Sequence, residues 1–137
     1  MNCRKLKEIN IKDFKTDKVI DMSNTFGFCT ELTSLDLSKF NTKNVKNMQG
    51  MFEECNNLKE ITFSLNFNTQ NVEDMSSMFY SCGTLQSLDL SSFSTSKVKN
   101  MTKMFAECVN LKTLNIQSKF DTKEVTDMSK MFQFYED

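Results

Sequence analysis

Cysteines recur along this chain at nearly constant intervals, and this periodicity restricts the fold more than any other feature. They are Cys3, Cys29, Cys55, Cys82 and Cys108, so the successive spacings are 26, 26, 27 and 26 residues. Periods of this length are typical of solenoids, in which each repeat forms one coil and the coils stack on one another. We therefore predict that residues 1–137 form a single repeat domain of about five coils of 26–27 residues each.

A short alternating segment in each repeat predicts a β-strand. In the second repeat it is Leu35-Asp36-Leu37, which sends two leucines to one face and the aspartate to the other. This is the period-two pattern of a half-buried strand. Equivalent segments end at Phe63, Leu90 and Ile116, and a first one is expected around Ile9. Stacking the coils should join these strands into a parallel sheet, with a crossover between each pair.

The crossover that returns the chain from one strand to the next is predicted to contain a helix. In the second repeat its apolar residues follow one another at helical spacing and form one stripe, namely Val45, Met48, Met51, Phe52 and Cys55. Thr42 stands just ahead of them, where its hydroxyl could cap the first helical amides. Two versions remain open. Either most of the segment is helical, or Val45–Met48 is extended and only about 49–55 is helical.

The combined pattern resembles a known family. Phe40, Thr42, Val45, Met48 and Cys55 with the strand motif repeat together over about 3–135. This pattern is similar to the bacterial surface-protein 26-residue repeat, which is related to the BspA-like leucine-rich repeats. The resemblance implies an α/β fold: a right-handed leucine-rich-repeat-type solenoid with a concave parallel sheet on one face and short helices or crossovers on the other. It also implies protein binding or cell adhesion, and a location at the bacterial cell surface or outside the cell.

The chain departs from this pattern at its ends. Thr25 replaces the second methionine of its repeat, and Tyr135 stands where a sixth cysteine would fall. We therefore expect the outer repeats to be specialised.

Charge and composition exclude several functions. Lys and Arg number 17 against 18 Asp and Glu, and the formal charge is −1, so nucleic acid is not a predicted partner. No apolar run approaches the roughly 18 residues of a membrane span, and the N-terminal residues do not form a signal peptide. The chain has no histidine, and its serines and cysteines recur at repeat intervals instead of forming one constellation. We therefore predict neither an enzyme nor a cofactor.

The predicted binding surface is the outward row of the sheet, because solenoids commonly bind partners on a concave polar face. We expect a protein or glycan to contact Ser34, Asp36, Glu60, Thr62, Ser87, Asp89, Thr113 and Asn115. A rival hypothesis is a structural spacer that assembles end to end, since neither terminal repeat carries a polar cap and an unpaired edge strand favours self-pairing.

The repeated methionines and cysteines admit other interpretations. Met48, Met51 and Cys55 are soft ligands that could hold Cu(I), although core packing explains the same spacing. Neighbouring cysteines in a column could also form disulfides. We favour buried free thiols, because cysteine packs readily as a small apolar residue.

Overall fold

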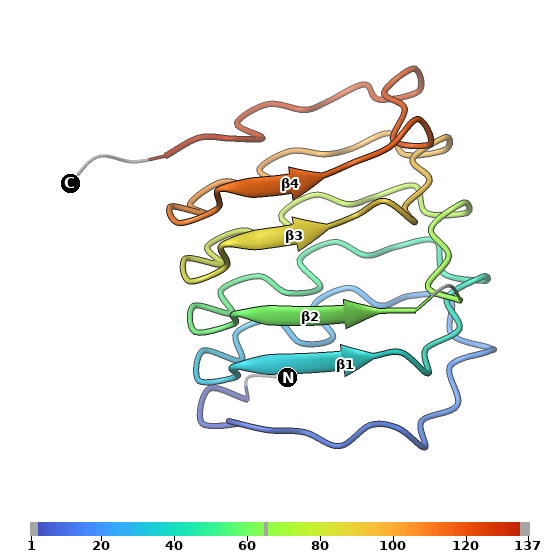
Figure 1. Ribbon diagram of the computed structural model, residues 1–137. Coiled ribbons are helices and arrows are strands. Elements are labelled where there is room, and N and C mark those ends of the chain that lie inside the picture. The colour runs from blue at the N-terminus through green and yellow to red at the C-terminus, as the bar shows by residue number, and fades with distance from the viewer. Residues whose placement is uncertain (1–2, 65, 135–137) are drawn as a thin grey trace.

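The computed structural model describes residues 3–64 and 66–134, which wind into five stacked coils (Figure 1). Taking each cysteine as a boundary, coils 1 to 5 are residues 3–28, 29–54, 55–81, 82–107 and 108–134. The strands are β1 (Ser34–Leu37), β2 (Glu60–Phe63), β3 (Ser87–Asp89) and β4 (Thr113–Asn115). β1 pairs with β2 and β3 with β4, both in parallel. Tyr135 lies outside the described residues.

The predicted α/β solenoid with helices is wrong, because the described residues contain no helix and only these four short strands. In the crossover that runs from coil 2 to the start of coil 3, the amides of Met51 and Cys55 donate to carbonyls three residues back, at 3.2 Å in both cases. The amides of Gly50, Phe52 and Glu54 instead donate to carbonyls of coil 3 at 2.8, 2.9 and 2.8 Å. An α-helix would direct every amide four residues back along its own segment. Here the amides alternate between closing β-turns and joining coils.

This arrangement requires left-handed backbone at regular positions. Gly50 and Glu54 have φ angles of 57° and 54°, and the equivalent residues of other coils share this conformation: Asn24, Phe28, Ser77, Ser81, Lys103, Glu107 and Lys130. Gly50 is the third residue of the β-turn that starts at Met48, a position where type II turns need a positive φ. The extended version of the crossover is correct up to Met48, since Asn47 forms parallel bridges with Asp21 and Asp74. The helix expected after it is absent.

The threonines at the start of each crossover link coils instead of capping helices. Thr42 Oγ1 donates to the carbonyl of Asn68 at 2.9 Å and accepts from the amide of Asn68 at 2.6 Å. Three other threonines each make the same pair of hydrogen bonds, namely Thr16, Thr69 and Thr95. Each hydroxyl thus satisfies one backbone donor and one acceptor of the next coil, at a corner where the strands do not extend.

The core lies between the strands and the crossovers and is built from columns of identical residues. One column stacks Phe26, Phe52, Phe79, Phe105 and Phe132, with ring centroids 5.9, 5.3, 5.7 and 5.4 Å apart. Coil 1 is less complete. The strand expected around Ile9 does not form, and Ile9 is 37% exposed.

The strand side of the stack is interrupted between coils 3 and 4. β2 and β3 are not paired, although bridges on the crossover side run without a break from Asp21 to Asp127. Figure 1 shows the wider gap between β2 and β3. Ile61 and Phe63 of β2 are only partly buried, whereas the equivalent leucines of β1 and those in and just after β3 are buried. We call the facing stretches 59–64 and 86–92 the β2–β3 seam.

Candidate binding surface on the strand side

The structure places all eight predicted site residues on the outward face of β1 to β4, and all are exposed. They form two rows. One row pairs Ser34 with Glu60 and Ser87 with Thr113; the other pairs Asp36 with Thr62 and Asp89 with Asn115. Within each sheet the two rows run side by side. The seam divides each row into one half on β1 and β2 and another half on β3 and β4. We call this surface the strand face.

The expected concavity does not follow from this fold. In leucine-rich repeats the stack curves because helices hold neighbouring coils farther apart on the outer side than on the strand side. Here no helix occupies the crossovers of the described residues, and the five coils stack in a nearly straight column (Figure 1). The strand face is therefore an open polar surface, and any enclosed site has to come from a local irregularity.

Two aspartates on this face are held ionised by local hydrogen bonds. The amide of Ser91 donates to Asp89 at 2.8 Å, and the Asn115 side chain donates to the same oxygen at 3.1 Å. The Ser91 bond lowers the pKa of Asp89, and hydrogen bonds from Ser38 lower that of Asp36. With Glu60, the eight residues contain three carboxylates and no base. The strand face therefore presents hydrogen-bond acceptors and negative charge to a partner.

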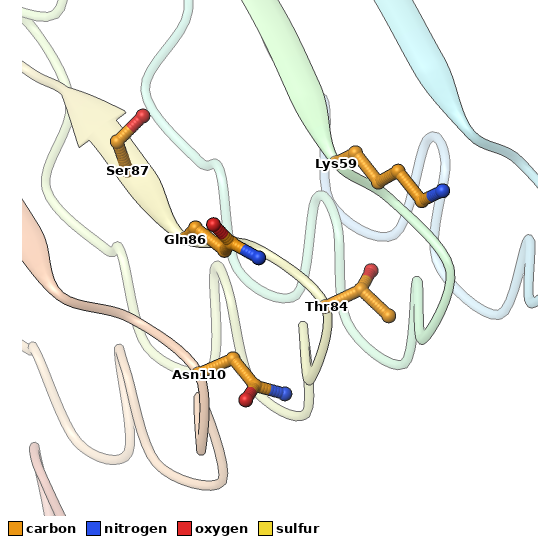
Figure 2. A pocket seen from close by; sticks show the side chains of 5 residues that line it. All are labelled: Lys59, Thr84, Gln86, Ser87 and Asn110. Carbon is orange, nitrogen blue, oxygen red and sulfur yellow. The ribbon is translucent and has the colours of Figure 1, made fainter.

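A depression of about 540 Å³ lies at one end of the seam and is lined by Lys59, Thr84, Gln86, Ser87 and Asn110 (Figure 2). Thr84 and Asn110 donate to backbone carbonyls of the preceding coil. Within the described residues, the side chains of Gln86 and Ser87 make no hydrogen bond. Sequence reasoning identified only Ser87 of this set, because the repeat pattern gives no sign that the sheet breaks here.

A second depression, of about 210 Å³, lies at the other end of the seam. Its lining consists of Phe63, Ser64, Asp89, Ser91 and Ser92. Phe63 is held from inside by Phe67 and Phe93, at centroid distances of 4.7 and 5.1 Å. Asp89 was a predicted site residue, whereas Phe63 and the three serines were not.

The cysteines form a column of hydrogen-bonded thiols. Cys55, Cys82 and Cys108 donate to the carbonyls of Phe26, Phe52 and Phe79 at 3.1, 3.2 and 3.0 Å. All five cysteines are free thiols. Burial raises the pKa of Cys55 to about 12 and that of Cys108 to about 11. Metals bind the thiolate, so a protonated, buried thiol that already donates to a carbonyl is poorly prepared for Cu(I).

No cluster suited to holding a metal ion is found within residues 3–64 and 66–134. There is no group of three or more histidine, cysteine, aspartate or glutamate residues placed to hold a metal ion. The same residues also contain no helix with the length and apolar character that a membrane crossing requires.

Both ends of the stack are apolar. An open groove of about 540 Å³ on coil 1 is lined mainly by apolar side chains, including Leu6, Phe14 and Phe26. On coil 5, 44% of Met128 and 52% of Phe132 are exposed. One face of the Phe132 ring stacks on Phe105, while coil 5 has no described coil beyond it.

Comparison with known proteins identifies one family. A family model described as Mycoplasma protein of unknown function, DUF285, matches residues 1–66 and 56–137, and the two overlapping matches together span the chain. No curated protein and no solved structure matches.

Proposed function

We propose that this chain, which belongs to the DUF285 family, is a non-enzymatic binding module whose strand face contacts a protein or glycan outside the cell. The observation that supports this is the pair of exposed polar rows on β1 to β4, held in register by strand pairing. The location outside the cell is proposed from the resemblance to bacterial surface-protein repeats.

The inward and outward positions of the strands differ in how much they vary between repeats. In each sheet, the inward position equivalent to Leu35 is always leucine or isoleucine, as the core requires. The outward position equivalent to Asp36 is in turn Asp, Thr, Asp and Asn. The core positions thus keep one chemistry while the outward positions vary from coil to coil. Such variation on a rigid frame is how solenoids present a specific surface to a partner.

The test is capture of partners from extracellular-matrix and host-cell-surface extracts. The intact chain is compared with a variant carrying Asp36→Lys and Asp89→Lys on the strand face. The control variant carries Asp21→Lys and Asp127→Lys on the crossover side, where both aspartates accept a serine amide at 2.8 Å, much as Asp36 and Asp89 do. The structural cost of the two variants is therefore matched. Capture that is lost only in the strand-face variant supports the proposal, and capture that is equal in both contradicts it.

A structural spacer is the second candidate, and the two apolar ends favour it. The groove on coil 1 is lined in part by Phe26, the first ring of the phenylalanine column, and Phe132 ends the same column on coil 5. Stacking coil 1 of one copy on coil 5 of another would continue the column. It would also bury Phe14, 57% of which is exposed.

Sedimentation velocity over a wide concentration range tests this candidate. End-to-end association predicts mass that grows with concentration, and Phe132→Ser or Phe14→Ser should each abolish that growth. Mixing the two variants should give no species longer than a dimer, because each retains only one intact end. A constant monomer mass at every concentration would reject the spacer.

A further inference from the structure

We infer that the β2–β3 seam is a binding site for an oligosaccharide. This inference rests on the proposed function and names its ligand class. It starts from a break in symmetry: β1 pairs with β2 and β3 with β4, but β2 and β3 do not pair, although coils 3 and 4 stay joined on the crossover side. A periodic surface offers similar contacts at each coil. A seam offers one location with its own shape.

The depression at the start of the seam has the chemistry of a site for hydroxyl-rich ligands. Thr84, Gln86, Ser87 and Asn110 are uncharged, and Lys59 is the single charged residue in the lining. Hydroxyl and amide side chains both donate and accept hydrogen bonds. A sugar hydroxyl also does both. Since Gln86 and Ser87 have no side-chain partner within the described residues, their groups are available without breaking an internal bond.

The second depression adds the two elements that the first lacks, an ionised acceptor and an apolar surface. The Asp89 carboxylate accepts from the Ser91 amide and the Asn115 side chain at one oxygen, and the Ser91 side chain also hydrogen-bonds to it. Because a carboxylate has about four acceptor positions, Asp89 can still accept from a sugar hydroxyl. The partly buried Phe63 ring can contact the apolar face of the same sugar, and Ser64, Ser91 and Ser92 add hydroxyls. An apolar contact combined with a few placed polar groups is the usual composition of a small-ligand site.

The geometry favours an oligosaccharide over a single sugar and over a peptide. The depressions lie at opposite ends of 59–64, which spans about 16 Å at about 3.3 Å per residue. An inserted peptide strand would need roughly 4.8 Å of additional separation between coils 3 and 4. The bridge between Asp74 and Asn100 holds the same coils at strand spacing, so an extra strand does not fit. A peptide lying on the surface would need apolar pockets for its anchors, and the seam offers only part of Phe63.

The experiment is binding of the full chain to an array of neutral and acidic oligosaccharides, followed by titration of each bound sugar. The seam variants are Asp89→Asn, which keeps the side-chain shape but loses the charged acceptor, and Gln86→Ala. The matched controls are Asp21→Asn and Gln49→Ala, which change the same residue types on the crossover side. Asp21 also accepts a serine amide at 2.8 Å, and Gln49 is exposed. We expect each seam variant to weaken binding about tenfold or more and each control to change it less than twofold.

The outcomes separate this inference from the proposed function. If no oligosaccharide binds the array but capture from extracts is lost in the strand-face variant, the proposed function holds and the seam inference is rejected. Sugar binding that is equal in Asp89→Asn, Gln86→Ala and the controls also rejects the seam as the site, although the chain would still bind glycans. Failure of both the array and the extract capture rejects both proposals.

Discussion

The substitution Thr69→Val tests whether the corner threonines hold neighbouring coils together. Only 1% of Thr69 is exposed, and its hydroxyl donates to the Ser94 carbonyl and accepts from the Ser94 amide, both at 2.8 Å. Valine has nearly the same shape as threonine, so the substitution removes two hydrogen bonds without opening a cavity. The Ser94 amide and carbonyl then lose their partner in the adjacent coil.

The size of the stability loss in Thr69→Val depends on how well water can replace the lost hydroxyl. An orphaned buried polar group costs about 1 to 3 kcal/mol. Ser94 is half-buried, so the lower end applies to each of its two groups. We expect Thr69→Val to lower the free energy of unfolding by about 2 kcal/mol, which is about 8 °C in Tm for a chain of this size. Thr69→Ser keeps the hydroxyl and loses one methyl, at a cost of about 1 kcal/mol.

Urea denaturation followed by circular dichroism measures both variants. Thr33→Val is the control, because Thr33 is exposed and its side chain makes no hydrogen bond within the described residues. Its effect should stay within about 0.5 kcal/mol. If apolar burial alone mattered, Thr69→Val would be more stable than Thr69→Ser. The hydrogen-bond argument predicts the opposite order of stability. A Thr69→Val variant as stable as Thr69→Ser would therefore refute the argument.

Three further predictions concern the left-handed positions, the thiols and the seam. Ser77 has a φ of 54°, so Ser77→Gly should raise the free energy of unfolding by about 1 kcal/mol; an unchanged or lower urea midpoint would contradict this. Burial raises the pKa of Cys55 from 9.0 to about 12, so the stability it contributes is complete below pH 9 and is lost as the pH rises toward 12, because the unfolded chain releases the proton first. The fall in urea midpoint between pH 8 and pH 10 should accordingly be smaller in Cys55→Ala than in the intact chain, and an equal fall would count against the assignment. In hydrogen exchange, amides of β3 that face β2 should exchange faster than amides of β2 that face β1, and similar rates would mean that the seam is closed in solution.

The strands were the part of the fold that the sequence predicted best. β1 to β4 lie on the alternating segments of repeats two to five, because alternation reports directly on which side chain faces the core. The strand predicted for the first repeat does not form. The residues around Ile9 form no bridge to β1, and Ile9 lines the open groove on coil 1.

The helix was predicted wrongly because two structures place side chains at the same intervals. In a helix, residues three and four apart share a face. In the crossover that ends coil 2, one β-turn joins Met48 to Met51 and the next joins Phe52 to Cys55 at the start of coil 3, and all four side chains are fully buried. The resulting stripe has helical spacing without helical hydrogen bonds. Glycine at position 50 was a local hint of a left-handed residue, but Glu54, Ser77 and Lys103 take the same conformation without any such hint.

The outward site residues could be predicted, whereas the seam could not, and the difference shows what a repeat pattern contains. Outward positions follow from alternation within one repeat. The seam depends on how one coil differs from its neighbours. At the position filled by Leu37, Leu90 and Ile116 in the other coils, coil 3 carries Phe63. Its ring stands at 72° to Phe93, with centroids 5.1 Å apart. An edge-on ring occupies more height along the stack than an aliphatic side chain, which accounts for the separation of β2 from β3. Phe63→Leu should therefore restore the repeat, close the seam and slow amide exchange in β3. If β3 amides exchange just as fast in Phe63→Leu, the ring is not the cause of the break.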